Sequence, residues 1–508
     1  MKYLLLLSFF VASMPRLAAT EKETIPVSQL IYNVWVVDGT GAAAQKASVR
    51  IRNKKIIAVG TLKPLPGELL IDGKGRTLTP GFIDTHSHLL GSFRSKPEAL
   101  AALNQGVTLI VAGQDGEGSP IDSILSQLKA RSVAVNIATY TGQTSLRKEV
   151  MGEKELHRKA SPEEIQQMCV LLAKEMRKGS LGLSTGLEYD GAFFSEKDEL
   201  VALAKTAAQF GGSYTSHIRS EDVQLKQAIE EIILIGREAK LPVQVSHIKI
   251  ALKDDWGKAQ ELLARLEKAR AEGIDITADC YPYDFWNSTL KVLFPKTDYD
   301  NLQSAAFAVE HTFDPNESIL FRYAPNPEYQ GKTIAAISAM RQETPAQTLL
   351  SLIAEAETYK KDHPSATAVE TIMGKSMVDE DVSSLLAWQH TNICSDGSIG
   401  GHPRAFGSFT RVLGHYVRDK KLLSLEEAVR KMTLLAAEHI GIANRGKIAP
   451  GYFADLVLLD PATVKDRSSI QEPAALSDGI EQVWVNGEVV YQNKQNTRRY
   501  PGMFIERK

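Results

Sequence analysis

Through the middle of the chain, short apolar runs alternate with longer stretches of helical periodicity. Eight of these runs have the length and composition of buried strands, and polar, glycine-rich sequence follows each one. The runs are Phe82–His86, Thr108–Ala112, Ala134–Thr139, Leu181–Ser184, Ser213–His217, Val243–His247, Ile274–Asp279 and Thr391–Ser395. Strands that alternate with helices indicate βαβ units and a parallel sheet. Eight of them predict an α/β fold, a TIM-like (β/α)8 barrel whose active site forms at the C-terminal ends of the strands.

A different pattern flanks the predicted barrel. Short β-rich pieces separated by turn residues fill positions 28–78 and return between 454 and 487, and we expect the two segments to pair into one small β-sandwich. Residues 284–386 break the regular spacing with helical patterns and acidic, proline-rich turns before the last strand. This inserted subdomain is either a lid over the barrel mouth or an inert elaboration.

The N-terminus has the pattern of a secretory signal. Lys2 precedes the apolar run from Tyr3 to Ala12, and small residues follow just before Thr20. Such a run is too short to anchor the protein in a bilayer. The expected organisation is therefore a signal peptide (1–19), a barrel (79–444) containing the insertion (284–386), and a sandwich made of 20–78 and 445–508. We expect an exported protein, periplasmic or secreted, with no membrane insertion after cleavage.

Composition narrows the class of ligand. The chain has 508 residues, 43% hydrophobic and 24% charged, as in an ordinary globular protein with a large core. Its formal net charge of −2 gives no electrostatic basis for binding nucleic acid or an anionic membrane. Its three cysteines, Cys169, Cys280 and Cys394, are too few and too far apart for a disulfide framework. We therefore expect a small-molecule or peptide substrate, and the oligomeric state stays open.

Potential metal ligands stand at or just beyond the ends of five predicted strands. They are His86, His88, Asp115, His217, His247 and Asp396. Positions i and i+2 of a strand share a face, so His86 and His88 can offer two imidazoles to one ion. Each residue alone has a structural alternative: a satisfied core histidine, a helix N-cap or an Asp-Gly turn. Their joint occurrence at barrel strand ends favours a centre for zinc or a similar ion.

Several longer motifs carry a family resemblance that covers nearly all of the chain after the signal. They include Pro-Gly-Phe-Ile-Asp-Thr-His-Ser-His (80–88), Leu-Gly-Leu-Ser-Thr-Gly-Leu-Glu-Tyr (181–189), Ser-His-Ile-Arg-Ser-Glu (216–221), Val-Ser-His-Ile-Lys (245–249), Tyr-Pro-Tyr (281–283), Ser-Asp-Gly (395–397) and His-Pro-Arg-Ala-Phe-Gly (402–407). With these motifs the chain resembles the amidohydrolase superfamily and, more closely, its D-aminoacylase (N-acyl-D-amino-acid deacylase) family.

The resemblance implies a centre of one or two zinc ions. In similar enzymes the histidines of the fifth and sixth strands and a residue after the second strand bind the main ion, which here are His217, His247 and Asp115. The remaining candidates, His86, His88 and Asp396, border a second position. The chain departs from the family at Asp115, where members commonly carry a cysteine. A carboxylate can also bind zinc and can bridge two ions.

The resemblance further implies hydrolysis of a linear amide. Zinc would activate a water molecule and polarise the scissile carbonyl, and Asp396 would take the proton of the water and pass it to the leaving nitrogen. Similar enzymes hold the free carboxylate of the substrate with residues matching Lys249, Arg404 and one tyrosine of Tyr-Pro-Tyr, either Tyr281 or Tyr283. The expected substrate is an N-acyl-D-amino acid, or a dipeptide with a C-terminal D-residue.

Two alternatives remain at this point. One is a cyclic amidase or deaminase of the same superfamily, which would have no need of a carboxylate-binding arginine. The other is a catalytically inactive barrel that binds its ligand without metal, and the absence of the family cysteine motivates it.

Overall fold

In a computed structural model of the chain, the described residues are 28–294, 296–366 and 368–507. The expected signal peptide at 1–19 lies outside them. Within these ranges, no helix has both the length and the apolar character that crossing a membrane requires.

All eight runs expected to form strands do so, with ends that differ by a few residues. The strands are β6 (Phe82–Asp84), β7 (Val107–Ala112), β8 (Asn136–Thr139) with its continuation β9 (Thr141–Gly142), β10 (Gly182–Gly186), β11 (Ser213–His217), β12 (Val243–Val245), β13 (Ile276–Cys280) and β18 (Thr391–Ile393). All neighbouring pairs among them are parallel. Apart from Thr141 in β9, all of their residues are buried, as expected of a parallel sheet covered on both faces.

The strands close into a ring through hydrogen bonds at two junctions. The amide of Leu181 donates to the carbonyl of Thr139 at 2.9 Å, and β9 pairs with β10, so the two parallel sheets are continuous there. At the other junction Ser87 pairs with Gly397 in a parallel bridge. The ring brings the C-terminal ends of all the strands to one face of the molecule.

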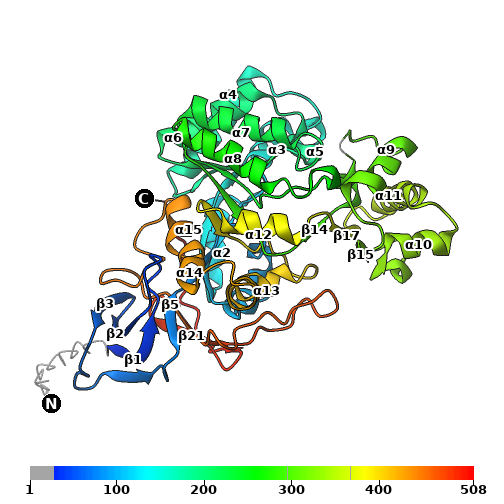
Figure 1. The fold of residues 1–508 in the computed structure, drawn as a ribbon. Helices are drawn as coiled ribbons and strands as arrows, with labels where there is room; N and C mark the ends of the chain where they lie inside the picture. The colour runs from blue at the N-terminus through cyan, green and yellow to red at the C-terminus, as the bar shows by residue number, and fades with distance from the viewer. Residues whose placement is uncertain (1–27, 295, 367, 508) are drawn as a thin grey trace, which may run out of the picture.

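Helices surround this ring (Figure 1). Those of the barrel are α1 (Leu100–Leu103), α2 (Ile121–Ala130), α3 (Gln143–Met151), α4 (Pro162–Met176), α5 (Asp190–Phe193), α6 (Lys197–Gln209), α7 (Leu225–Ala239), α8 (Ala259–Ala271), α12 (Asp379–Ala387), α13 (Arg404–Arg411), α14 (Leu425–Met432) and α15 (Leu434–His439). Local sequence explains their starts: at α4, Ser161 and Glu164 form a reciprocal capping box ahead of Pro162. The inward face of α7 buries Ile229, Ile232 and other aliphatic side chains.

A nine-stranded sheet joins the two ends of the chain. It contains β1 (Gln29–Val36), β2 (Gln45–Arg52), β3 (Lys55–Gly60), β4 (Leu69–Asp72), β5 (Thr77–Pro80), β19 (Leu456–Leu459), β20 (Ile480–Val485), β21 (Glu488–Gln492) and β22 (Gln495–Asn496). The connection is made by β5 and β19, which pair antiparallel. An apolar cluster around Trp484 and Leu456 is buried within it.

Residues 284–386 contain a sheet that the sequence pattern did not indicate. Its strands β14 (Phe285–Ser288), β15 (Ile319–Tyr323), β16 (Lys332–Thr333) and β17 (Glu370–Lys375) are antiparallel and pack with α9 (Leu302–Phe307), α10 (Ile334–Arg341) and α11 (Pro345–Asp362). This region has its own apolar core, around Phe313, Leu320 and Leu349. Figure 1 shows it on the side of the barrel away from the nine-stranded sheet.

Candidate metal centre and substrate cavity

The six candidate ligands gather where the barrel strands end. His217 is the last residue of β11, whereas the others lie in the loops that follow β6, β7, β12 and β18. Strands β6 and β12 are shorter than expected, so His86, His88 and His247 are held by loops rather than by strand geometry. The His86 and His88 rings nevertheless lie close together, with centroids 5.3 Å apart.

Three of these residues have strained backbones. Asp115, His247 and Asp396 have φ angles of 55°, 36° and 48°, in the left-handed region. Each costs roughly 1–3 kcal/mol unless the surroundings hold it, and such residues concentrate at functional sites. Hydrogen bonds hold two of them here: the amide of His247 donates to Asp279 at 2.6 Å, and that of Asp396 donates to the carbonyl of His86 at 2.8 Å.

The first ligand group consists of His86, His88, Asp115 and Asp396. The His86 Nε2 atom lies 3.3 Å from Asp115 Oδ1 and 3.6 Å from Asp396 Oδ1. The His88 Nε2 atom lies 3.4 Å from Asp115 Oδ2 and 3.2 Å from Asp396 Oδ1. Donors at about 2.0–2.2 Å from a tetrahedral zinc ion are separated by about 3.3–3.6 Å. The spacing of this group therefore fits one ion.

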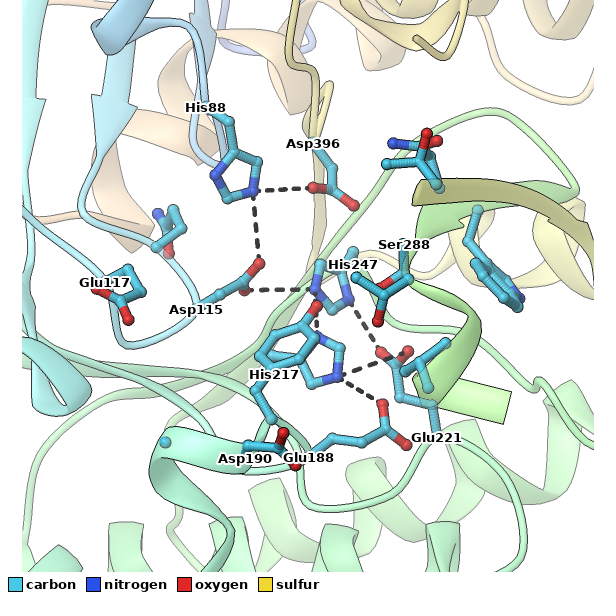
Figure 2. Close-up of a pocket in the computed structure, with 18 of the residues that line it drawn as sticks. His88, Asp115, Glu117, Glu188, Asp190, His217, Glu221, His247, Ser288 and Asp396 are labelled. Carbon is cyan, nitrogen blue, oxygen red and sulfur yellow. Dashed lines mark hydrogen bonds and ion pairs between the residues drawn. The ribbon is translucent and has the colours of Figure 1, made fainter. Parts of the chain in front are cut away.

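The second group consists of Asp115, His217 and His247. The His247 Nε2 atom lies 3.5 Å from Asp115 Oδ1 and 3.1 Å from His217 Nδ1. These separations also match neighbouring ligands of one ion. Figure 2 shows Asp115 between the two groups, with His88 on one side and His247 on the other.

Two side chains at the centre have buried polar atoms without hydrogen-bond partners, and a bound cation would supply a partner for them. Neither ring nitrogen of His86, which is fully buried, has a hydrogen-bond partner, and neither does Asp115 Oδ1. A buried polar atom without a partner costs about 1–3 kcal/mol. Together with the donor spacing, this indicates that the centre is built to hold metal.

The charges of the ion-free centre favour a bound cation. The pKa values of two histidines are raised, and that of one aspartate is lowered. Desolvation at the rim of the cavity opposes protonation of His88, but its contacts with Asp115 and Asp396 outweigh this effect and raise its pKa to about 10. Burial and Lys249 likewise oppose protonation of His247, yet Glu221 and Asp115 raise its pKa to about 10. Conversely, burial opposes ionisation of Asp396, but Arg404 and His88 lower its pKa.

Two glutamates that the sequence analysis did not identify contact the histidines of the second group. Each lies against the ring nitrogen that does not face the other ligands of the group. Glu188 Oε2 lies 2.7 Å from His217 Nε2, and Glu221 Oε1 lies 3.0 Å from His247 Nδ1. A carboxylate in this position fixes which ring nitrogen of a histidine faces the metal. Burial raises the pKa of Glu188 to about 7, against the opposing effect of His217. The available signal was their position, since Glu188 lies two residues beyond β10 and Glu221 four beyond His217.

The centre opens into a cavity of about 700 Å³. Arg404, Lys249 and Tyr281 line it, and the segment 286–289 of the inserted region forms part of its wall. Arg404 Nη1 lies 2.7 Å from Asp396 Oδ2, while its Nε atom has no hydrogen-bond partner. The buried hydroxyl of Tyr281 also has none.

Lys249 and Tyr283, the other two residues expected to contact the substrate, lack a free polar group that faces the cavity. The Nζ atom of Lys249 already donates to Glu221 at 2.5 Å, and it lies 2.8 Å from His247 Nδ1. Tyr283 is absent from the described residues that line the cavity, and its ring packs against Arg411 at 4.8 Å. Among the two tyrosines, only Tyr281 faces the centre.

Comparison with known proteins relates this chain to amidohydrolases. The family model described as "Amidohydrolase family" matches residues 69–314 and 384–491. An N-acyl-D-glutamate deacylase of Alcaligenes xylosoxydans xylosoxydans is 34% identical, over 94% of this chain and 96% of its own. A D-aminoacylase of the same organism is 32% identical, over 96% and 99%.

Solved structures agree with the sequence relatives. A crystal structure of D-aminoacylase matches with a TM-score of 0.83 and 32% identity, covering 95% of this chain and all of the other. The N-acyl-D-glutamate deacylase of Bordetella bronchiseptica matches with a TM-score of 0.84 and 30% identity, over 95% of this chain and 100% of its own. That enzyme was solved with zinc and a phosphonate inhibitor that mimics the tetrahedral intermediate of its reaction.

Proposed function

Because this chain belongs to the amidohydrolase family, we propose that it is a zinc-dependent hydrolase that cleaves the amide bond of N-acyl-D-amino acids. The relatives that match nearly its whole length act on such compounds. The observation that carries the proposal is the sharing of one cavity by the ligand groups and Arg404.

The donor set suits zinc, and the residues of both groups would hold it. Zinc, when bound, activates water and polarises a carbonyl group. Asp396 is placed to move the proton: its Oδ1 atom faces His86 and His88, and its Oδ2 atom faces Arg404. Its lowered pKa keeps it ionised, so it can accept a proton and deliver it to the leaving nitrogen.

Arg404 and Tyr281 supply the features that a free substrate carboxylate requires. Arginine binds carboxylates in a fixed, bidentate geometry. Arg404 has a donor without a partner, and it lies over the ring of Tyr281 at 4.7 Å, whose hydroxyl is a second free donor. Lys249 would also bind the substrate carboxylate if it released its hydrogen bond to Glu221. These donors favour a linear N-acyl amino acid over a neutral cyclic amide.

The remaining features of the organisation are also part of the proposal. We infer that the protein is exported, on the signal-like pattern of residues 1–19. The pairing of β5 with β19 supports a terminal β-sandwich, from 20–78 and 445–508, beside the barrel (79–444). Fractionation of cells producing the full chain tests export, because a product found only in the cytoplasm with an intact N-terminus would contradict it.

The function is tested with zinc-loaded protein and paired N-acetyl-D- and N-acetyl-L-amino acids. We expect hydrolysis of the D series, with little or none of the L series. Arg404→Ala should lower kcat/KM by about 30-fold to several thousand-fold, since loss of a buried charged contact costs about 2–5 kcal/mol. Because Arg404 also pairs with Asp396, N-acetyl-D-amino-acid amides, which lack the carboxylate, should lose activity too, but by a clearly smaller factor than the acids.

Lys360→Ala is the matched control, because Lys360 is an exposed cation on the same cavity wall. Equal loss on acids and amides would contradict the role of Arg404, and activity on cyclic amides alone would support the cyclic amidase alternative. Less than one equivalent of bound zinc, with no activity after zinc addition, would support a metal-free binding protein.

A further inference from the structure

A second cavity, of about 670 Å³, adjoins the cavity of about 700 Å³ that holds the candidate metal centre. Their common boundary includes Glu188, Tyr189, Asp190 and Val292, which line both cavities. Cavities of about 300–1,000 Å³ enclose drug-sized ligands. An N-acetyl amino acid is smaller than such a ligand. It would therefore leave the second cavity unfilled.

This boundary lies at the end of the centre away from Arg404. Arg404 contacts Asp396, with Nη1 2.7 Å from Oδ2. Glu188 and Tyr189 instead contact His217: Glu188 Oε2 lies 2.7 Å from Nε2, and the two ring centroids are 4.5 Å apart. Figure 2 shows Asp396 and Glu188 with the histidines of the second ligand group between them. A substrate whose carboxylate binds Arg404, with its scissile amide at the ligand groups, would therefore direct its acyl group toward the second cavity.

Most charged side chains around the second cavity already have partners within the protein. Arg219 binds Glu231 at 2.9 Å, and Lys291 binds Glu357 at 2.8 Å. Lys360 is exposed, so water can solvate its charge. A charged acyl group would have to break such pairs or lose solvation without replacement, which is costly. The charges of this cavity therefore favour an uncharged acyl group.

Apolar side chains also line the second cavity. They include Phe193, Val223, Val292 and Tyr299. Val223 is 40% exposed, although valine is more often buried. Contact with an apolar group would remove this surface from water, which is favourable. With Val292 at the boundary, these side chains provide a path for an apolar chain that leads away from the centre.

We propose that the preferred substrate carries an uncharged, apolar acyl chain longer than acetyl, which passes Val292 and lies in the second cavity. This inference rests on the proposed hydrolysis of N-acyl-D-amino acids and adds the identity of the acyl group. Arg404 and Tyr281 would hold the carboxylate at one end of the substrate, and the second cavity would hold the other end. The amide bond to be cleaved then lies between them, at the ligand groups.

The first test varies the length and charge of the acyl group. Zinc-loaded protein is assayed with acetyl, butanoyl and heptanoyl derivatives of D-leucine and D-glutamate. Full burial of one methylene is worth about fourfold, and partial exposure reduces this, so kcat/KM should rise about two- to fourfold for each added methylene. The 6-aminohexanoyl derivative has the length of the heptanoyl one but carries a positive charge, and it should lose most of this gain.

Val292→Trp tests the path, because a larger side chain at the boundary would block the second cavity. The ratio of kcat/KM for the heptanoyl and acetyl substrates should fall by about 30-fold or more, the gain from five methylenes at twofold each. Val223→Asp, which adds a charge at an exposed position of the second cavity, should lower the same ratio if the tryptophan variant does not fold. Val170→Trp is the matched control: Val170 is 59% exposed on α4 and is not among the described residues that line either cavity. It should keep the wild-type ratio.

Three results would overturn the inference. They are a ratio near 1 in the wild-type protein, equal activity on the heptanoyl and 6-aminohexanoyl substrates, and an unchanged ratio in folded Val292→Trp and Val223→Asp. Hydrolysis of the acetyl substrates in those cases would leave the proposed function standing. Hydrolysis of no member of the D series would instead contradict the proposed function itself.

Discussion

Glu188 is expected to control how tightly the second ligand group binds its ion. Its carboxylate lies 2.7 Å from Nε2 of His217. If this nitrogen carries the proton, then Nδ1, which faces His247, is left free to bind metal. Glu188→Gln keeps the size of the side chain but removes its charge. The amide can still accept a hydrogen bond through one oxygen, although a weaker one.

The magnitude follows from the kind of contact that is lost. A hydrogen bond to a charged group contributes about 1.5–3 kcal/mol, and the neutral amide retains part of it. Mutation of partners that orient metal ligands typically costs about 10–100-fold in metal affinity. We therefore expect Glu188→Gln to weaken zinc binding by about 10-fold, and Glu188→Ala, which removes the acceptor, to approach 100-fold. Competition with a chromophoric chelator measures both constants.

The pH dependence distinguishes this role from a purely structural one. Burial raises the pKa of Glu188 to about 7 in the ion-free protein. Below that pH the wild-type carboxyl is mostly neutral and resembles glutamine, whereas above it the wild-type side chain is charged. The difference in affinity between wild type and Glu188→Gln should widen as pH rises through 7. A difference below about twofold, or one independent of pH, would refute the reasoning.

Asp190→Asn is the control, because Asp190 is two residues away, lines the same cavity and accepts a hydrogen bond from Tyr299. It should leave zinc affinity unchanged. If it weakens binding as much as Glu188→Gln does, the effect comes from general cavity charge and not from the orientation of His217.

Three further predictions follow from other parts of the structure. Since the pKa values of His88 and His247 are both about 10 without metal, zinc binding at pH 8 should release about two protons, and calorimetry in buffers of different ionisation enthalpy that finds none would contradict this. Burial lowers the pKa of Lys431 to about 8, so the unfolded state binds this proton more readily between pH 8 and 10.5. Lys431 should therefore add about 3 kcal/mol of stability over that range, against the opposite contribution of the raised histidines, so in urea unfolding the difference in stability between wild type and Lys431→Met should shift by this amount in favour of the wild type as pH rises. Because Cys280 and Cys394 are buried and the centre has no sulfur donor, thiol alkylation of the native protein should leave its zinc content unchanged, and loss of zinc on alkylation would refute a sulfur-free centre.

The sequence predicted the barrel strands well because their signal is local. An apolar run such as Val107–Ala112 can only be satisfied where both faces of a strand are covered, and all six of its residues are buried. The strand ends were less accurate for a tertiary reason. β6 stops at Asp84 because the following residues take part in the junction with β18, where Ser87 pairs with Gly397.

Other features of the site and the fold could not be predicted from the spacing of residues along the sequence. Glu188 and Glu221 become recognisable only when their carboxylates lie against His217 and His247, which requires the fold. Tyr281 and Tyr283 would share a face in an extended strand, but β13 ends at Cys280 and only Tyr281 lines the cavity among the described residues. The sheet in 284–386 was missed because its strands are short, and a bulge between Leu320 and Arg322 interrupts the register.

The position of Asp396 connects the proposed recognition of the substrate carboxylate with the proposed proton transfer. One oxygen faces the histidines of the first ligand group and the other faces Arg404, so a single buried carboxylate is shared between the metal side and the substrate side. A substrate carboxylate that binds Arg404 would compete with Asp396 for the guanidinium group and so weaken the ion pair between Arg404 and Asp396. Asp396 then becomes a better proton acceptor, because Arg404 is the largest influence that lowers its pKa. In the proposed mechanism, binding of a substrate carboxylate would therefore prepare Asp396 to move the proton, and a ligand without a carboxylate would leave Asp396 paired with Arg404.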